Sequence, residues 1–310
     1  MLAQFVLMNI SAAFYAYKLT HFRTPTNDTW TKPVSNNIFA KTWRLFSGPT
    51  CYKQVISGVP DFPFSTVILM TSNGISIEAW YGKTDSISKG TVILFHGLMD
   101  NKRWLTDEAD AFRIMGYNVM MVDARNHGNS GGEVTTIGYN ESEEVKLSYE
   151  HISQAGEKNI FLWGASMGAV EVIKAVSDFH LQPSGIIIDA PFYSLQSHLE
   201  GRARALGFPS QPFGFLTSFW IGMENGFNGL AFKTTRYARE INCPVLMEYG
   251  KNDKLVLRYE TDAIFNAIAS ANKKLTIYDN AGHEYFLRND PAMWNKEVEI
   301  FLKRCSKATF

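Results

Sequence analysis

The sequence has no excess of either charge and very little cysteine. Its 30 basic and 30 acidic residues cancel over 310 residues, so no broad electrostatic field would recruit nucleic acid. Cys51, Cys243 and Cys305 cannot form a closed disulfide framework, and none has the Cys or His spacing of a zinc site. The sequence therefore predicts no nucleic-acid partner and no metal centre.

Charge is also missing from the first segment, residues 2–17. This stretch is apolar, but it contains Gln4, Asn9 and Ser11 and is shorter than the roughly 18 to 20 residues that a membrane-spanning helix needs. No Lys or Arg precedes the apolar run and no small-residue cleavage site follows it, which disfavours a secretory signal. We expect a helix that packs on the protein or contacts a membrane surface, with a shortened anchor or signal as the alternative. The sequence is compatible with either a cytoplasmic or a membrane-associated protein.

The strongest chemical signal is the pentapeptide Gly-Ala-Ser-Met-Gly at residues 164–168. It follows an apolar, strand-like run at residues 159–163 and precedes a helix-like stretch that begins at Ala169. At a strand-to-helix turn, this pattern holds the central residue in a strained backbone conformation that only small flanking residues permit. Ser166 is therefore the candidate nucleophile. The N-terminal N–H groups of the following helix would face a developing oxyanion.

Two further polar residues follow predicted strands nearer the C-terminus. The apolar strand 244–249 leads into Gly-Lys-Asn and then Asp253, and strand 274–278 leads into Asn-Ala-Gly and then His283. Loops that a rigid sheet holds in place commonly carry catalytic side chains. Asp253 and His283 are therefore candidates to act together with a serine nucleophile.

Five motifs occur in one order along the chain: His96-Gly97, an Asp-x-Arg-x-His-Gly-x-Ser-Gly sequence at residues 123–131, GASMG, GKND and AGHE. With them, residues 54–304 resemble the α/β-hydrolase superfamily, and most closely its bacterial esterases, lysophospholipases and serine-aminopeptidase-like hydrolases. Sequences of that group often carry an apolar N-terminal segment followed by a motif similar to KLTHF at residues 18–22. One departure is Asn126, where a Gly is usual, although Asn tolerates left-handed backbone conformations.

The resemblance implies a catalytic triad of Ser166, Asp253 and His283, since the superfamily places these residues in the order nucleophile, acid, histidine. Asp189, at the end of an earlier predicted strand, is a rival for the acid because some members place it there. We favour Asp253, whose Gly-x-x-Asp context after the penultimate strand is the commoner location.

The resemblance also implies an oxyanion hole formed by the backbone N–H groups of Leu98 and Met167, and it implies no cofactor. Four residues in the glycine-rich loops are expected to hold backbone in place rather than to react: His96, Asp123, Arg125 and His127. We expect the aspartate and the arginine of this set to pair with each other.

Alternating apolar runs and helical patterns predict an α/β fold, with a mostly parallel eight-stranded sheet covered by helices on both faces. Ser72-Asn73-Gly74 between two strand patterns predicts an antiparallel start. An aromatic insertion after the sixth strand is too apolar for a solvent loop and predicts a small helical cap. The expected parts are an apolar N-terminal segment (1–22), a linker and lead-in (23–53), an α/β-hydrolase core (54–190 and 242–310) and the cap (191–241).

These features together predict a serine hydrolase that cleaves a carboxylic ester through an acyl-enzyme. The aromatic cap and the apolar N-terminus favour an apolar acyl substrate, either a small-molecule ester or a lipid-like one. A serine peptidase or thioesterase is the alternative, because one triad serves all of these reactions. A catalytically silent binding protein on the same fold is a third reading. A serine at the elbow argues against epoxide hydrolases and haloalkane dehalogenases, and the oligomeric state is left open.

Overall fold

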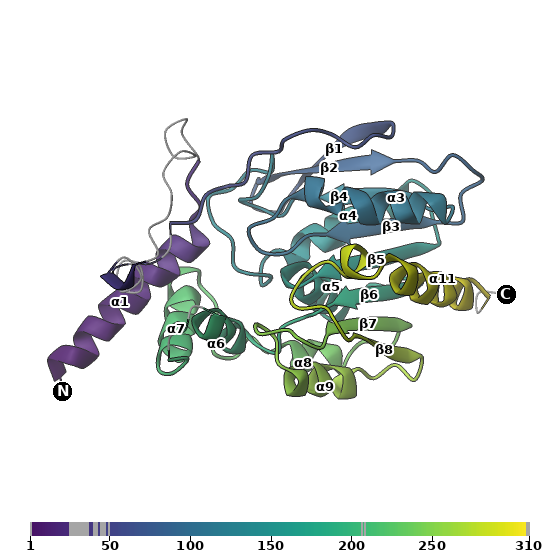
Figure 1. The fold of residues 1–310 in the computed structure, drawn as a ribbon. Coiled ribbons are helices and arrows are strands. Elements are labelled where there is room, and N and C mark those ends of the chain that lie inside the picture. Colours follow the sequence, from purple (N-terminus) through teal and green to yellow (C-terminus); the bar gives the residue numbers. More distant parts are fainter. Residues whose placement is uncertain are drawn as a thin grey trace.

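The computed structural model describes residues 2–24, 37–39, 43, 48, 50–205, 207 and 209–307. Most of the predicted linker, residues 23–53, lies outside the described residues. Figure 1 shows a layered body, with one central sheet between helices, and a long N-terminal helix beside it.

The sheet has eight strands in the order β1-β2-β4-β3-β5-β6-β7-β8. They are β1 (Phe64–Met70), β2 (Ser76–Gly82), β3 (Thr91–Phe95), β4 (Asn118–Val122), β5 (Ile160–Ala165), β6 (Gly185–Asp189), β7 (Val245–Gly250) and β8 (Lys273–Tyr278). Strand β2 pairs antiparallel with both β1 and β4, and all other pairs are parallel. The predicted mostly parallel sheet with an antiparallel start is confirmed.

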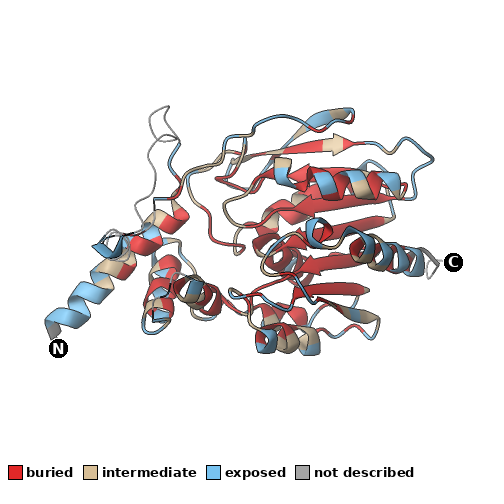
Figure 2. Ribbon diagram, in the orientation of Figure 1, coloured by how far each residue is buried: buried red, intermediate tan, exposed pale blue. Residues whose placement is uncertain are grey.

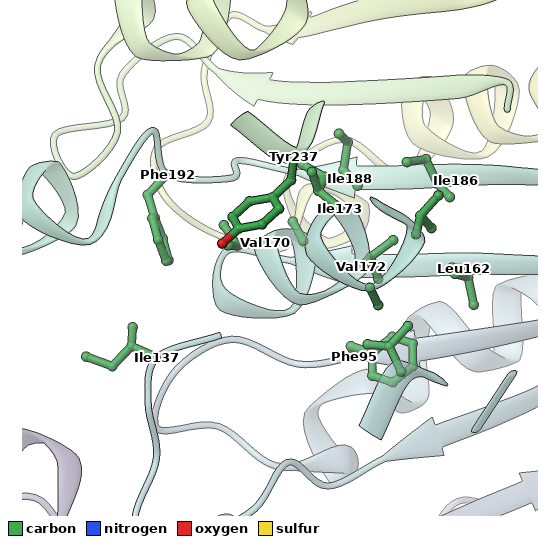
Figure 3. Close-up of a cluster of buried hydrophobic side chains, with 14 of the residues drawn as sticks. Phe95, Ile137, Leu162, Val170, Val172, Ile173, Ile186, Ile188, Phe192 and Tyr237 are labelled. Carbon is green, nitrogen blue, oxygen red and sulfur yellow. The ribbon is translucent and has the colours of Figure 1, made fainter. Parts of the chain in front are cut away.

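Successive side chains of each strand point to opposite sides of the sheet, so both faces carry apolar side chains. Helices cover both of these faces. In β3, Ile93 and Phe95 belong to one apolar core, whereas Val92 and Leu94 belong to another. The first core, shown in part in Figure 3, includes residues of α4 (Ser142–Gln154), α5 (Met167–Asp178), α8 (Thr234–Ala238) and α9 (Arg258–Ala267). The second includes residues of η1 (Lys102–Leu105), α3 (Thr106–Ile114), α10 (Phe286–Asn289) and α11 (Pro291–Lys307).

Two helices of the insertion after β6 lie at the carboxyl end of the sheet. They are α6 (Leu195–Ala205) and α7 (Phe213–Glu224), and α7 packs against α1 (Leu2–Thr20). The rings of Tyr15 and Phe213 meet edge to face there, with their centroids 4.7 Å apart. Figure 1 shows these three helices grouped on one side of the body. The cap region of the sequence is therefore helical, and α1 adds to it.

Helix α1 has two different halves. Its second half packs on the body, where Ala16 and Leu19 are fully buried, whereas Phe5 and Leu7 in the first half are exposed (Figure 2). Among the described residues, no helix combines the length and the apolar character needed to cross a membrane. The segment is thus a helix that is partly integrated into the core.

The predicted pairing of Asp123 with Arg125 is wrong. Asp123 accepts a hydrogen bond from the backbone N–H of Lys102 at 2.7 Å and forms a buried ion pair with the same lysine's ammonium group. Arg125 instead donates to Glu144 of α4 at 2.5 Å. The carboxyl ends of β3 and β4 lie side by side, so the chain after β3 brings a buried lysine to Asp123. Both loop residues therefore find partners that are distant in the sequence.

Candidate active site

Ser166 lies in the sharp turn between β5 and α5, with φ 52° and ψ −106°. Glycine is required on both sides of it. A β-carbon on Gly164 would lie 2.4 Å from the carbonyl oxygen of Gly168, and one on Gly168 would lie 2.2 Å from the carbonyl oxygen of Phe95. The backbone N–H of Ser166 donates to the carbonyl oxygen of Asp189 at 2.8 Å, which fixes the turn to β6. Such strained conformations occur mainly at functional sites, where the surrounding structure holds them.

The structure brings Ser166, His283 and Asp253 together. Nε2 of His283 lies 2.9 Å from Oγ of Ser166, and Nδ1 lies 2.7 Å from Oδ2 of Asp253. The three residues follow β5, β8 and β7, whose carboxyl ends meet at one edge of the sheet. A carboxylate accepts hydrogen bonds, so Nδ1 carries the proton and Nε2 accepts from the serine hydroxyl.

The carboxylate of Asp253 is held from two sides. Its Oδ1 accepts backbone N–H groups from Leu255 at 2.7 Å and from Val256 at 2.9 Å, which leaves Oδ2 for the histidine. The Asp253 side chain is fully buried, whereas the His283 side chain is 19% exposed. The acid is therefore rigid and shielded, and the imidazole can still reach a substrate.

Asp189, the rival for the acid, forms no hydrogen bond with His283 in the structure. It ends β6 beside Glu248 of β7, and both side chains are buried. Burial and the neighbouring Glu248 raise the pKa of Asp189 well above its usual value, which favours the neutral form. A neutral carboxyl cannot stabilise an imidazolium ion by charge. The geometry and the charge therefore both favour Asp253 over Asp189.

The predicted oxyanion-hole residues come from two different elements near Ser166. Leu98 follows β3 and lines the cavity above Ser166. Met167 is the first residue of α5, and the first N–H groups of a helix have no acceptor within that helix. Two N–H donors that approach from different elements could bind one oxygen atom between them.

Two buried histidines join the loop after β3, which carries Leu98, to the loop after β4. Nε2 of His127 accepts the backbone N–H of Met99 at 3.2 Å, and Nε2 of His96 accepts the backbone N–H of Ala124 at 3.1 Å. Burial, with a smaller effect from His96, lowers the pKa of His127 well below its usual value, which keeps its ring neutral. Only a neutral imidazole has a ring nitrogen that can accept a hydrogen bond from a backbone N–H group. Both histidines therefore hold backbone in place, as the sequence predicts.

A cavity of about 130 Å³ lies against Ser166 and His283. Residues of α6 form part of its wall, including His198 and Arg202. No motif surrounds either residue, so the sequence predicts no role for them. Only their spacing of four residues within a helical insertion indicates that they share one face of a helix. No cluster of three or more His, Cys, Asp or Glu residues suited to a metal ion occurs in the part of the chain that the structure describes.

Comparison with known proteins identifies the family. The family model described as "Serine aminopeptidase, S33" matches residues 86–216 and 223–291, which include Ser166, Asp253 and His283. The chain belongs to this family. Its eight-stranded sheet is that of an α/β hydrolase, and the expected superfamily is confirmed.

Relatives of this S33 family member include esterases and lipases. The Pyrococcus furiosus esterase Pf2001 is 25% identical, with a TM-score of 0.67 over 81% of this chain and 98% of the esterase chain. The protein YqkD of Bacillus subtilis is 25% identical over 71% of this chain and 73% of its own length. The lysophosphatidylserine lipase ABHD12 of Danio rerio is 24% identical over 57% of this chain. The alignment spans 47% of that lipase, about half of its length. The chain is thus an esterase- and lipase-like hydrolase.

Proposed function

We propose that the protein is a serine hydrolase that cleaves carboxylic esters through an acyl-enzyme. One observation carries the proposal: the imidazole of His283 lies 2.9 Å from the hydroxyl of Ser166 and 2.7 Å from the carboxylate of Asp253. A serine hydroxyl is a weak nucleophile unless an adjacent base removes its proton, and the base in turn needs a group that orients it.

The reaction has two acyl-transfer steps. His283 removes the proton of Ser166 as Oγ attacks the carbonyl carbon, and it then gives this proton to the departing alcohol. In the second step His283 removes a proton from water, the hydroxide attacks the acyl-enzyme, and Ser166 recovers its proton as the acid leaves. Asp253 holds the required tautomer throughout and stabilises the imidazolium ion by its charge.

The negative oxygen of each tetrahedral intermediate lies between the N–H groups of Leu98 and Met167. The dipole of α5 adds to their effect, because its positive end faces Ser166. Loss of one such donor costs about 3 kcal/mol in the transition state. The neutral His127 supports this step indirectly, since it fixes the loop on which Leu98 lies.

The substrate we propose has an apolar acyl group. Helices α6 and α7 act as the cap, and the exclusion of water by such a cap strengthens the electrostatic interactions within the site. The esterase and lipase relatives support this choice. A serine peptidase is the second candidate, which the description of the matching family model favours.

A substrate panel tests the proposed function. Purified protein would be assayed with 4-nitrophenyl esters from acetyl to dodecanoyl, with aminoacyl 4-nitroanilides and with acyl thioesters. We expect the highest kcat/KM for esters, with an optimum of chain length, and no turnover by Ser166→Ala. Preference for the anilides would favour the peptidase. Folded protein that hydrolyses none of the three classes would favour the silent binding protein.

We also propose that α1 and α7 contact a lipid surface. Between the two helices lies a mostly apolar groove of about 550 Å³, which Glu224 of α7 also lines, and residues 2–17 carry no charge. Phe14 on α1 and Met223 on α7 are 57% and 63% exposed. Such a surface can enter the headgroup region of a membrane without loss of hydration from any charged group of residues 2–17. Burial raises the pKa of Glu224 to about 7, which lowers the cost of placing this carboxyl at such a surface. It would keep the hydrolase near lipid-like substrates.

Substitution of exposed residues tests this contact better than deletion of residues 1–22, since the second half of α1 belongs to the core. We expect Leu7→Glu and Phe14→Glu to reduce co-sedimentation with phosphatidylcholine vesicles and to leave hydrolysis of a soluble ester unchanged. Ile87→Glu is the control, because Ile87 is 93% exposed and lies outside both helices. An equal loss in the control would contradict the proposal. So would a dimer in solution that both α1 substitutions dissociate, because the surface would then bind a second copy.

A further inference from the structure

Helix α6 presents two polar side chains to the catalytic cavity. His198 and Arg202 are four residues apart, so they lie on the same face of the helix. Both line the cavity that also contains Ser166 and His283. His198 is only 4% exposed, and its Nε2 has no hydrogen-bond partner among the described residues. A buried polar atom without a partner points to a group that is supplied from outside the chain.

Arg202 has no counter-ion in the described part of the chain, although it is half-buried. One guanidinium nitrogen lies 3.8 Å from the sulfur of Met99, and the guanidinium group is also close to the side chain of Tyr15 on α1. Its Nε is buried and unpaired among the described residues. Buried Arg125 has a carboxylate partner, Glu144, whereas half-buried Arg103 and Arg204 form no ion pair among the described residues. Of the half-buried arginines without such a partner, Arg202 lines the cavity that contains Ser166, and the other two do not. A cation that is partly removed from water without such a partner is costly.

The acidic groups of the same cavity are engaged elsewhere. Asp100 accepts the hydroxyl of Tyr285 at 2.8 Å, and Glu284 accepts the backbone N–H of Gly282 at 3.0 Å. Burial and Glu248 raise the pKa of the third acid, Asp189, which favours its neutral form. None of them forms an ion pair with Arg202 among the residues described. The cavity therefore contains an arginine that forms no ion pair among the described residues.

We propose that Arg202, together with His198, binds an anionic group of the ester substrate. This inference rests on the proposed ester hydrolysis and names its substrate class: an ester that carries a carboxylate or a phosphate near the scissile bond. A guanidinium group binds either anion through two parallel N–H donors.

His198 can add a third donor to this site. Burial, with smaller effects of Arg202 and His283, lowers the pKa of His198 well below its usual value. The neutral ring can carry its one proton on the unpaired Nε2 and donate it to the anion. Helix α6 belongs to the insertion after β6. The residues that would bind the anion therefore lie on a different element from the triad residues that perform the reaction.

Two matched substrate pairs test the inference. The first pair compares 4-nitrophenyl butyrate with 4-nitrophenyl hemisuccinate, which adds a carboxylate on the acyl side. The second compares a monoacylglycerol with the corresponding acylglycerol 3-phosphate, which adds a phosphate on the alcohol side. The wild-type protein should prefer the anionic member of at least one pair in kcat/KM. The pair that shows the preference identifies the anion and the side of the ester that carries it.

Arg202→Gln should reduce this preference about 30-fold, as expected for the loss of a charge-assisted hydrogen bond, and mainly through KM. Arg204→Gln is the matched control, because Arg204 lies on the same helix but does not line the cavity. Arg204 is half-buried and donates to the carbonyl oxygen of Leu255. Its replacement should change the preference less than about twofold, because no donor to the anion is lost. Arg202→Lys, which keeps the charge but loses the planar pair of donors, should retain part of the preference and provides the test if Arg202→Gln does not fold.

Three outcomes would overturn the inference: no anionic preference in the wild-type protein, equal losses on neutral and anionic esters in Arg202→Gln, or full loss of the preference in Arg204→Gln. Equal losses would mean that Arg202 only supports the fold through Tyr15 and Met99. A folded wild-type protein that hydrolyses no ester at all would be a different result, because it would contradict the proposed function itself.

Discussion

Replacement of Asp253 by Asn is expected to lower kcat for ester hydrolysis by about three to four orders of magnitude. An amide can donate to Nδ1 of His283 through its NH₂ group, which would move the proton to Nε2 and leave Ser166 without a base. The amide also carries no charge to stabilise the imidazolium ion. Asn has nearly the shape of Asp, and its oxygen can still accept the N–H groups of Leu255 and Val256. The fold should therefore survive.

Asp189→Asn is the matched control for this prediction. The environment of Asp189 already favours a neutral carboxyl, so a neutral amide of the same shape changes little. We expect kcat to fall by much less than in Asp253→Asn, with both variants compared at equal thermal stability. The reverse ranking of the two variants would show that Asp189 is the catalytic acid.

The fold was predictable where local chemistry determines it. Asn73-Gly74 indicates a hairpin, and the structure has β1 and β2 joined antiparallel at that point. Gly164 and Gly168 indicate a close approach of backbone, and a β-carbon at either position would collide with a carbonyl oxygen. Asn126 adopts the left-handed conformation expected of it, with φ 59°. Each of these features depends on a few adjacent residues, so a single sequence displays them.

Contacts between distant elements were not predictable. Asp123 and Arg125 are close in the sequence, but their charged partners come from η1 and α4. His198 and Arg202 reach the cavity only because α6 packs over the carboxyl end of the sheet. Which half of α1 is buried likewise depends on the position of α7. Composition and spacing contain no information on how such helices pack.

The second large effect concerns the reactivity of Ser166 itself. A fluorophosphonate attaches rapidly to a hydroxyl that has an adjacent base and faces an oxyanion hole. Nε2 of His283 lies 2.9 Å from Oγ of Ser166, and the N–H groups of Leu98 and Met167 are the oxyanion hole that we propose. Ser130, by contrast, is 1% exposed and donates its hydroxyl to the carbonyl oxygen of Asp123 at 2.7 Å. We therefore expect nearly complete labelling of Ser166 and almost no labelling of Ser130.

Labelling of the folded protein with a fluorophosphonate at pH 8, followed by mass spectrometry of the peptides, tests the central claim most directly. We predict one modified residue, Ser166, with no label in Ser166→Ala and slow labelling in Asp253→Asn. Folded wild-type protein in which Ser166 stays unmodified, or in which another serine takes the label, would contradict it.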